Sequence, residues 1–561
     1  MNISNCKSLI ELYFNKSREK SRDDFFLSWL KPNYNNLYTW GEISDKILTL
    51  SKKIEEVIKN QDRCLLLSEN RPEWLISDLA IMNAGGISVP IFTTYADSDY
   101  KYILEDCKPS VIIVSNQTQF DKIKNYLNSE IKLIISFEKI NYSSLIFEEI
   151  FNNTNRLNSK ENKSISRNSI ACIIYTSGTS GNPKGVVLSH GGILSNCEGA
   201  LDVLKPITGD NEIVFLTWLP LSHSYEHTVQ FIQILLGAKI YYAESLDKLI
   251  PNMNIAKPTI MTAVPRFYQN LFNKINLNFK TQKGLKKILI NKTIELGIKK
   301  LNNLKLSLIE NILNFFCDVL VRKKIRNQFG GHLRAFVSGG GALDKNIGEF
   351  LNAIGLPTLQ GYGLTEASPV VSCNLPNKIK IETVGPIFST NQVKIAQDGE
   401  ILVKGENIMI GYWNKKKETD EVIKEGWLHT GDIGELDEEG YLKITDRKKD
   451  IIVNFGGENI SPVKIENLLC LNEHIKQSFV YGDKKNYLVA ILVVEQSFNL
   501  EEEIKIYIKT LNESLSSIEK IKKYFLIKDE FTIENRMLTP TLKLKRKEIT
   551  KKYFQQLENL Y

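Results

Sequence analysis

The chain has 561 residues, which is more than one hydrophobic core organises, so its length predicts at least two domains. Hydrophobic residues make up 42% of it and charged residues 24%, a mixture that argues against a disordered, collagenous or membrane-embedded chain. No run approaches the ~18 consecutive apolar residues of a spanning helix, and residues 1–30 mix charges where a secretory signal has an apolar block. We therefore expect a cytoplasmic protein.

The charge and the cysteines exclude further classes. The net charge is +7, and residues 271–330 alone carry thirteen Lys or Arg against three Asp or Glu. Such a basic patch can bind phosphates, contact a membrane surface or simply be solvated. Just 13 of the 72 basic residues are Arg, the side chain that best reads phosphates and base edges, so we expect no nucleic acid partner. The eight cysteines contain no Cys-x-x-Cys pair, which argues against a zinc ribbon or a disulfide scaffold.

In chain order, short β-branched runs alternate with helical patterns from about residue 60 to 375. Strands are predicted at 64–67, 111–115 and 170–175, and a helix at 72–84. A strand–turn–helix–strand unit is predicted later in the chain: a strand at 333–337, a glycine turn, a helix capped by Asp344, and a strand from 358. This alternation is typical of an α/β sheet, whose ligands bind at the carboxyl ends of the strands.

The pattern changes in the last third of the chain. Residues 383–441 show short strands and Gly turns, which predict a β subdomain. The charged run 446–450 has no apolar period, so we place a domain boundary there, with an N-terminal domain at 1–447 and a C-terminal domain at 448–561. We expect an α/β fold with a large multi-lobed N-terminal domain, built of parallel-sheet α/β subdomains plus the β subdomain, and a smaller α+β C-terminal domain.

The sharpest local feature is the segment Tyr-Thr-Ser-Gly-Thr-Ser-Gly-Asn-Pro-Lys-Gly at 175–185, which follows a predicted strand. Its glycines and hydroxyl residues let backbone N–H groups curl around phosphate oxygens, while the lysine adds a positive charge. It is not a Walker A loop, because Lys184 precedes Gly185 where Walker A has Ser or Thr. The plain alternative is a flexible surface hairpin. The candidate phosphate-binding residues are Thr176, Ser177, Gly178, Thr179, Ser180, Gly181 and Lys184.

Three further motifs follow in order: Gln-Gly-Tyr-Gly-Leu-Thr-Glu at 360–366, Gly-Trp-Leu-His-Thr-Gly-Asp at 426–432 and Asp-Arg-Lys-Lys at 446–449. With the loop at 175–185, they make the chain resemble the acyl-adenylate-forming superfamily of acyl-CoA synthetases, firefly luciferases and non-ribosomal peptide adenylation domains. The resemblance runs from about residue 65 to 547. The segments 219–227 and 264–267, the second leading into a long helical insertion, look most like the long-chain fatty acyl-CoA branch.

The resemblance implies a reaction with ATP, Mg²⁺ and coenzyme A. A fatty acid is joined to the α-phosphate of ATP with release of pyrophosphate, and the thiol of coenzyme A then attacks the acyl-adenylate. Two unit charges ~4 Å apart repel by ~4 kcal/mol at an effective dielectric near 20, so cations and N–H donors must offset the approach of a carboxylate to a triphosphate. The alternatives in the same chemistry are a medium-chain or aryl acid as the substrate and a carrier protein as the acceptor.

By the resemblance, the loop at 176–184 holds the β- and γ-phosphates, Glu366 and Thr176 bind Mg²⁺, and Thr365 contacts phosphate. Tyr362, followed by Gly363, stacks on adenine. The ribose is contacted by Asp432 and Arg447. Gly339, Gly340 and Gly341 let the backbone approach the nucleotide and the acyl chain.

The C-terminal domain is implied to supply a lysine to the carboxylate and α-phosphate. Thr541-Leu542-Lys543 with Arg546 fits the family's motif except that Leu542 stands where relatives have glycine, so we choose Lys543 and keep Lys545 as the alternative. The resemblance also implies that this domain is mobile and swings about Lys449 between the half-reactions, with Gly456 and Gly457 then lining the approach of the thiol.

The segment His223-Ser-Tyr-Glu-His227 has three interpretations. The resemblance makes His223 a wall of the carboxylate site, which we favour. Two structural histidines on a buried helix are the second possibility. The third is a zinc hydrolase, because His-x-x-Glu-His is also an inverted zinc-peptidase motif in which both histidines bind the metal.

A helical stripe at 304–321 repeats apolar residues in two adjacent rows, a pattern that most often packs into a core, as we expect here. Basic residues flank it, so the alternative is peripheral contact of residues 299–326 with an anionic inner membrane surface. The sequence as a whole predicts an AMP-forming long-chain fatty acid:CoA ligase, with a non-catalytic lipid-binding protein as a further alternative. It sets neither the acyl chain length nor the oligomeric state.

Overall fold

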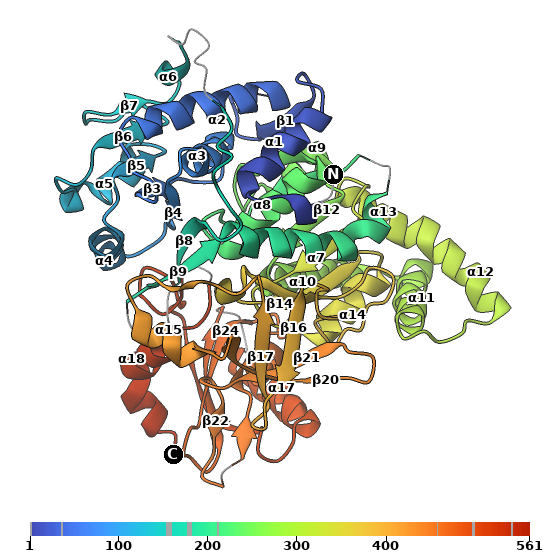
Figure 1. Ribbon diagram of the computed structural model, residues 1–561. Helices are drawn as coiled ribbons and strands as arrows, with labels where there is room; N and C mark the ends of the chain where they lie inside the picture. Colours follow the sequence, from blue (N-terminus) through green and yellow to red (C-terminus); the bar gives the residue numbers. More distant parts are fainter. Residues whose placement is uncertain are drawn as a thin grey trace.

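The computed structural model describes residues 3–34, 37–152, 160–176, 182–209, 212–456, 458–495, 500–539 and 542–561 (Figure 1). Two eight-stranded sheets dominate this part of the chain, and a smaller α+β unit follows at the C-terminal end. The fold class expected from the sequence is confirmed. The predicted strand–turn–helix–strand unit also forms: Asp344 accepts hydrogen bonds from the N–H groups of Asn346 and Ile347 at the start of α14 (Lys345–Ala353).

The first sheet has the strand order β18-β9-β8-β4-β3-β5-β6-β7. Neighbours from β8 to β7 are parallel, whereas β9 and β18 run antiparallel at one edge. The central strands are apolar throughout because both faces of the sheet are covered by other elements. Its strands are β3 (Arg63–Leu67), β4 (Ile87–Pro90), β5 (Val111–Val114), β6 (Leu133–Ser136), β7 (Leu145–Ile146), β8 (Ile170–Thr176), β9 (Lys184–Ser189) and β18 (Gly411–Tyr412).

The second sheet has the order β15-β14-β13-β12-β10-β11-β1-β2, with antiparallel strands only at its two edges. The carboxyl ends of β12, β13 and β14 therefore meet at one edge of the sheet. Its strands are β1 (Phe25–Trp29), β2 (Leu37–Thr39), β10 (Val214–Thr217), β11 (Lys239–Tyr242), β12 (Ile260–Ala263), β13 (Ala335–Ser338), β14 (Thr358–Gly363) and β15 (Val370–Cys373).

Helices α7 (His190–Thr208) and α8 (Ser224–Leu236) pack on each other and belong to a hydrophobic core that includes strands of both sheets. Leu194 of α7 and Phe231 of α8 are fully buried in this core. The two helices thereby fix the spacing between the sheets. The other helices of the two lobes are α1 (Leu9–Glu19), α2 (Trp40–Glu55), α3 (Pro72–Asn83), α4 (Asp97–Cys107), α5 (Gln117–Asp121), α6 (Glu149–Asn152) and α9 (Leu249–Ala256).

The β subdomain expected at 383–441 is an antiparallel sheet of strands β16 (Asn391–Ile395), β17 (Glu400–Gly405), β20 (Trp427–Leu436), β19 (Ile423–Lys424) and β21 (Leu442–Arg447). A short helix, α15 (Lys416–Val422), precedes β19. The pairing of β20 with β21 places Asp432 opposite Arg447. The register of this hairpin therefore brings together two residues that lie on separate strands.

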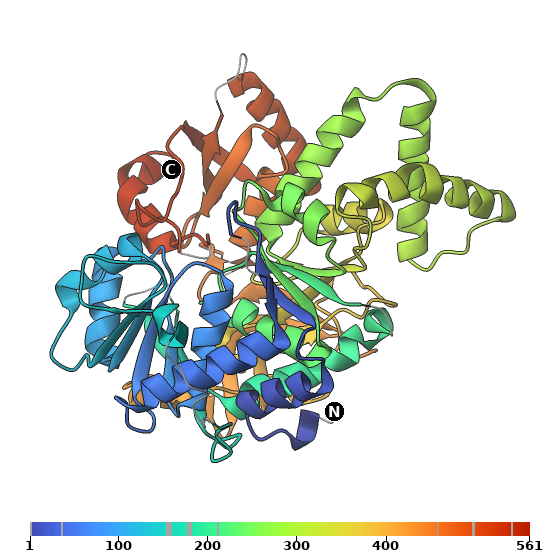
Figure 2. The same ribbon diagram turned by 90° about the horizontal axis from the view of Figure 1, so that it is seen from above.

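The C-terminal unit contains a three-stranded sheet of β24 (Ile475–Tyr481), β25 (Leu488–Val494) and β26 (Ile521–Ile527) and a pair formed by β22 (Ile452–Val453) and β23 (Asn459–Ile460). Its helices are α16 (Pro462–Leu469), α17 (Leu500–Ser514) and α18 (Arg546–Glu558). Figure 2 shows this unit, orange to red, lying against the N-terminal lobes. One contact is the hydrogen bond from Gln269 Nε2 to the carbonyl oxygen of Cys470, at 2.7 Å.

A helical arm projects from the second sheet (Figures 1 and 2). It follows α10 (Pro265–Thr281) and consists of α11 (Gly284–Leu301), α12 (Leu308–Cys317), the π-helix η3 (Asp318–Arg322) and α13 (Lys323–Gln328). The expectation that the stripe at 304–321 packs into a core is wrong, because Leu308 is 85% exposed and Phe315 65%. No helix within the described ranges combines the length and apolarity needed to span a membrane.

Candidate active site

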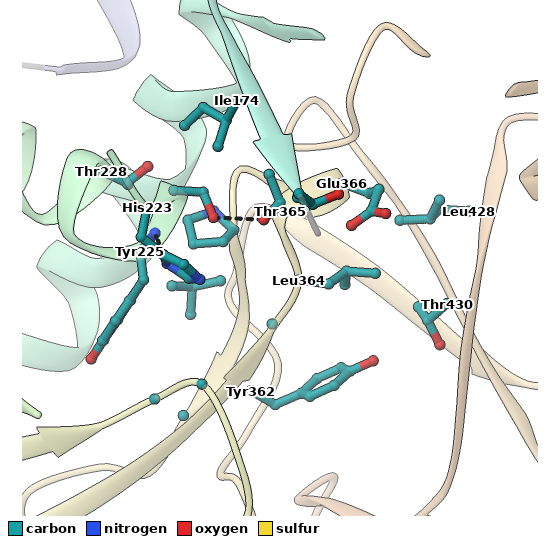
Figure 3. A pocket seen from close by; sticks show the side chains of 18 of the residues that line it. Ile174, His223, Tyr225, Thr228, Tyr362, Leu364, Thr365, Glu366, Leu428 and Thr430 are labelled. Atoms are coloured by element: carbon teal, nitrogen blue, oxygen red, sulfur yellow. Dashed lines mark hydrogen bonds between the residues drawn. The ribbon is translucent and has the colours of Figure 1, made fainter. Parts of the chain in front are cut away.

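A pocket of about 580 Å³ opens where the two large sheets, the β subdomain and the C-terminal unit meet. Its walls come from the ends of β8, β9, β13 and β14, from the first turns of α8, from the first half of β20, and from the end of β21 with the loop that follows it. Figure 3 shows His223, Tyr362, Thr365, Glu366 and Thr430 around this pocket. Most of the candidate residues of the sequence motifs lie in this one place.

Tyr362, Arg447 and Asp432 form one polar end. Tyr362, the penultimate residue of β14, donates its phenolic hydrogen to Oδ2 of Asp432 at 2.7 Å, while Nε of Arg447 donates to Oδ1 at 2.8 Å. Tyr362 and Arg447 line the pocket, and Asp432 is 6% exposed behind them. The Asp432 carboxylate raises the pKa of Arg447, and burial together with that carboxylate raises the pKa of Tyr362. The aromatic face and the oriented carboxylate suit a nucleoside.

Glu366, Lys184 and Tyr412 form the second polar end. The hydroxyl of Tyr412 donates to Oε1 of Glu366 at 2.8 Å, and Nζ of Lys184 lies 4.8 Å from the centre of the Tyr412 ring. Thr176 is the Cα partner of Lys184 across β8 and β9, so the two ends of the predicted phosphate loop are held together. Residues 177–181, which include the candidates Ser177, Gly178, Thr179, Ser180 and Gly181, lie outside the described residues.

Thr365 and Glu366 belong to a short 3-10 helix, Thr365–Ala367, directly after β14. The Thr365 hydroxyl lies 2.9 Å from the hydroxyl of Ser224 in the first turn of α8 (Figure 3). This contact joins the motif at 360–366 to the start of α8. Glu366 and Thr176 offer carboxylate and hydroxyl oxygens, the hard donors that Mg²⁺ prefers, so these residues fit that ion.

His223 caps α8: its Nδ1 accepts a hydrogen bond from the N–H of Tyr225 at 3.1 Å. It lines the pocket, and burial, followed by the charge of Lys543, lowers the pKa of His223 to about 4. The imidazole is therefore neutral at neutral pH, with Nε2 left to contact a substrate.

Lys543 reaches the same pocket from the C-terminal unit. The surrounding protein, and next the Arg447 cation, lower the pKa of Lys543, whereas Asp432 and Glu366 raise it. Its neighbour Leu542 has φ = 61°, a left-handed conformation that glycine adopts most readily. Leucine thus occupies a backbone geometry that favours glycine, and Thr541 before it lies outside the described residues.

The pocket also has an apolar arm, which the sequence patterns did not reveal. It runs between α7 and α8 toward β10 and β12, far along the chain from the polar motifs. Its walls include Ala200, Val203, Leu204, Phe215, Val229, Ile232, Ile260 and Phe388. An extended hydrocarbon group could lie along this wall while a polar head stays near His223.

Comparison with known proteins identifies the family of the chain. The sequence pattern described as AMP-binding enzyme matches residues 14–413, and that described as AMP-binding enzyme C-terminal domain matches residues 449–561. The chain belongs to the AMP-binding enzyme family.

This AMP-binding enzyme resembles curated relatives along most of their length. It is 31% identical over 619 residues to "Long-chain-fatty-acid--CoA ligase 5" of Rattus norvegicus, a match that covers 100% of this chain and 89% of the relative. It is 29% identical over 528 residues to "Long-chain-fatty-acid--CoA ligase FadD15" of Mycobacterium bovis, covering 89% of this chain and 88% of the relative.

Solved structures share its fold at low identity. An anthranilate CoA ligase, AuaEII, in complex with anthranoyl-AMP superimposes with a TM-score of 0.78 at 19% identity and 99% coverage of both chains. ATP-bound MatB from Rhodopseudomonas palustris gives a TM-score of 0.74 at 20% identity, covering 97% of this chain and 99% of that one.

Two glycine positions of this AMP-binding enzyme leave no room for a side chain. A Cβ on Gly339 would lie 2.8 Å from the ring of Tyr225, and one on Gly363 would lie 2.0 Å from the carbonyl oxygen of Pro369. Both glycines line the pocket, as do Gly340 and Lys449. Of the described residues, Gly341 and Gly456 are not brought to the pocket wall, and Gly457 lies outside the described residues.

The second histidine of the His-x-x-Glu-His segment does not join the first. His227 is buried, and its Nε2 lies 2.9 Å from Oδ2 of Asp78 on α3. Burial disfavours the imidazolium, but the contacts with Asp78 and Cys172 together outweigh burial and raise the pKa of His227 to about 10. Among the described residues no three His, Cys, Asp or Glu side chains gather to hold a metal. The arrangement supports a structural His227 and gives the zinc hydrolase interpretation no third ligand.

Proposed function

We propose that this AMP-binding enzyme is an AMP-forming long-chain fatty acid:CoA ligase. The observation that carries the proposal is a single pocket that joins a nucleoside end, a phosphate end and an apolar arm. The relatives named long-chain-fatty-acid--CoA ligase support the choice of a fatty acid over an aryl acid. The apolar arm lined by α7 and α8 supports it independently.

In the first half-reaction, Tyr362 holds the adenine ring and Asp432 accepts hydrogen bonds from the ribose, with Arg447 fixing the carboxylate. Each Asp432 oxygen already accepts one hydrogen bond and keeps a second lone pair for a ribose hydroxyl. Lys184, Thr176 and Thr365 contact the phosphates. Glu366 and Thr176 would hold Mg²⁺, which would supply positive charge to offset the charge on the triphosphate.

Neutral His223 bounds the carboxylate of the fatty acid, and Lys543 approaches it from the C-terminal unit. As the carboxylate oxygen attacks the α-phosphorus, negative charge builds on the phosphate oxygens and on the departing pyrophosphate. The Lys543 ammonium stabilises that charge at a place where surrounding protein reduces the solvent screening.

The second half-reaction needs a different arrangement of the same chain. Lys543 lines the pocket in this arrangement, and we infer that coenzyme A needs the approach that Lys543 occupies. We therefore propose that residues 448–561 form a mobile domain that turns about Lys449 relative to residues 1–447, moving Lys543 out and bringing Gly456 and Gly457 to the path of the thiol.

A panel of acids from acetate to stearate tests this function by AMP release with and without coenzyme A. We expect turnover to require ATP and Mg²⁺, to rise with chain length and to depend on coenzyme A. Greater turnover of benzoate or anthranilate than of palmitate would replace the fatty acid by an aryl acid. Turnover with a carrier protein but not with coenzyme A would replace the acceptor. Absence of pyrophosphate exchange with every acid would reject adenylation itself.

A further inference from the structure

The helical arm presents its apolar side to solvent and its polar side to the protein. Glu310 of α12 pairs with Lys299 of α11 at 2.7 Å, and Asn314 accepts from Arg322 at 2.9 Å. Cys317, on the same side, is fully buried. This is the reverse of a helix that covers a hydrophobic core.

The exposed side is continuous. Its members occupy two neighbouring rows along α12 and η3, spaced by three and four residues, and each is at least 36% exposed. We call them the apolar tip: Leu308, Ile309, Ile312, Leu313, Phe315, Phe316, Val319 and Leu320. Contiguous apolar patches of this kind mark interaction surfaces in proteins that are stable in water.

The reversed orientation is fixed by contacts at the base of the arm. Gly297 of α11 packs so closely on α14 that a Cβ would lie 2.5 Å from Cα of Ala353. The guanidinium of Arg322 donates to the carbonyl oxygens of Ala353 and Thr293, at 2.7 and 3.0 Å. The polar side therefore cannot turn outward without breaking these contacts.

The unpaired charges of the helical arm, within the described part of the chain, are all positive. All three acids of residues 271–330 are engaged: Glu295 and Glu310 with Lys299, and Asp318 with Arg326. Several lysines of the arm are exposed, and in the described part of the chain no acidic side chain lies within 4 Å of them. These are Lys283, Lys286, Lys287, Lys300, Lys305, Lys323 and Lys324.

This charge decides between occupants. A second copy of the chain would set one strongly basic arm against another, which like-charge repulsion opposes. An anionic bilayer offers phosphates to the lysines and a hydrocarbon boundary to the leucine, isoleucine and phenylalanine side chains. We propose that the apolar tip and its flanking lysines dock the enzyme on an anionic phospholipid surface.

Vesicle co-sedimentation of the full-length protein tests this proposal without nucleotide or fatty acid, so its outcome is separate from that of the proposed function. The probes are phosphatidylcholine vesicles with and without phosphatidylglycerol. We expect binding only to the anionic vesicles and weaker binding at high salt. The variant Ile312→Ser/Phe315→Ser/Phe316→Ser should lose roughly tenfold or more in vesicle affinity, since these side chains are exposed and supply inserted area.

A matched control replaces three exposed apolar residues elsewhere, Leu246→Ser/Ile506→Ser/Phe554→Ser, and should bind as the wild type does. Lys323→Gln/Lys324→Gln should lose roughly tenfold, whereas Lys505→Gln/Lys509→Gln on α17 should not. Equal losses in the tip and control variants, or equal binding to neutral vesicles, would overturn the proposal. So would a concentration-dependent dimer that the triple tip variant abolishes, because a second copy would then cover the tip.

Discussion

Asp432 is held by two donors at once, Tyr362 at 2.7 Å on one carboxylate oxygen and Arg447 at 2.8 Å on the other. The three residues come from three strands, β14, β20 and β21, and the carboxylate therefore has one orientation toward the pocket. Such charge-assisted pairs are among the stronger hydrogen bonds in proteins. Nucleoside binding should consequently depend on the charge of Asp432 as well as on its shape.

Replacing Asp432 with Asn should raise the KM for ATP by roughly 10- to 100-fold, because hydrogen bonds to a charged partner contribute about 1.5–3 kcal/mol and Arg447 loses its partner. The KM is measured by pyrophosphate exchange. Asp437→Asn, a change in the same subdomain at a residue paired with Lys380, is the control and should leave the KM for ATP unchanged. An unchanged KM in Asp432→Asn would remove this residue from the nucleoside site.

Lys543→Ala should slow acyl-adenylate formation by roughly 10²- to 10³-fold, as expected for loss of one charge at a developing anion. Thioester formation from supplied acyl-adenylate should stay near the wild-type rate, because Lys543 would have left the pocket by then. The control is Lys545→Ala, whose backbone N–H donates to Met537 and would be retained. Equal loss of both half-reactions in Lys543→Ala would contradict a turning domain, and a larger loss in Lys545→Ala would transfer the role.

Glu366→Gln should lower turnover by roughly 10²-fold at fixed Mg²⁺ and raise the Mg²⁺ concentration needed for half-maximal rate, since an amide is a weaker ligand for a hard cation. Titration of Mg²⁺ at saturating ATP measures both effects. The Tyr412→Phe variant removes only the hydrogen bond to Oε1 of Glu366 and should change the rate by less than about tenfold. Normal Mg²⁺ dependence in Glu366→Gln would end its assignment to the metal.

The motif at 360–366 shows why part of the site was predictable. Tyr362 lies at the carboxyl end of β14 and Glu366 follows that strand, so the fold class alone places them at a common edge with Gly339. Tyr412 and the apolar arm carry no such local signal. Tyr412 reaches Glu366 because β18 pairs with β9, a long-range pairing that no short window of sequence encodes.

The stripe at 304–321 is a case in which the prediction from sequence was wrong. Its spacing correctly predicts a helix with one apolar side, but periodicity gives no information on which side faces the protein. That choice depends on Arg322 and Gly297, whose partners on α14 lie 31 and 56 residues away in the chain. The spacing of His223 and His227 likewise left the role of His227 open, because its partner Asp78 belongs to another helix.

The apolar arm of the pocket predicts a change in chain-length preference. Ile232→Trp would fill space between α7 and α8, and we expect the kcat/KM for palmitate to fall roughly 200-fold, because about four excluded methylenes contribute ~0.8 kcal/mol each. Short acids should keep their kcat/KM within about threefold. Ile255→Trp, at an exposed position of α9, is the control. A uniform loss for all acids would mean that the chain does not lie along α8.

The pair of His227 and Asp78 predicts a pH-dependent stability that is separate from the chemistry. The pKa of His227 is raised from its ordinary 6.5 to about 10, so the folded state binds this proton more tightly than the unfolded chain does. The stabilisation is complete below about pH 6.5, declines as the pH rises, and is lost above about pH 10.

Asp78→Asn leaves the imidazole without its charged partner and should lower the free energy of unfolding by about 3–5 kcal/mol at pH 6.5. The difference from the wild type should shrink steadily between pH 7 and pH 9.5, which urea unfolding at several pH values measures. Asp437→Asn, an exposed carboxylate, should shift stability by less than about 1 kcal/mol. If the difference between Asp78→Asn and the wild type stayed constant over this range, His227 would not carry the proton that the Asp78 contact implies.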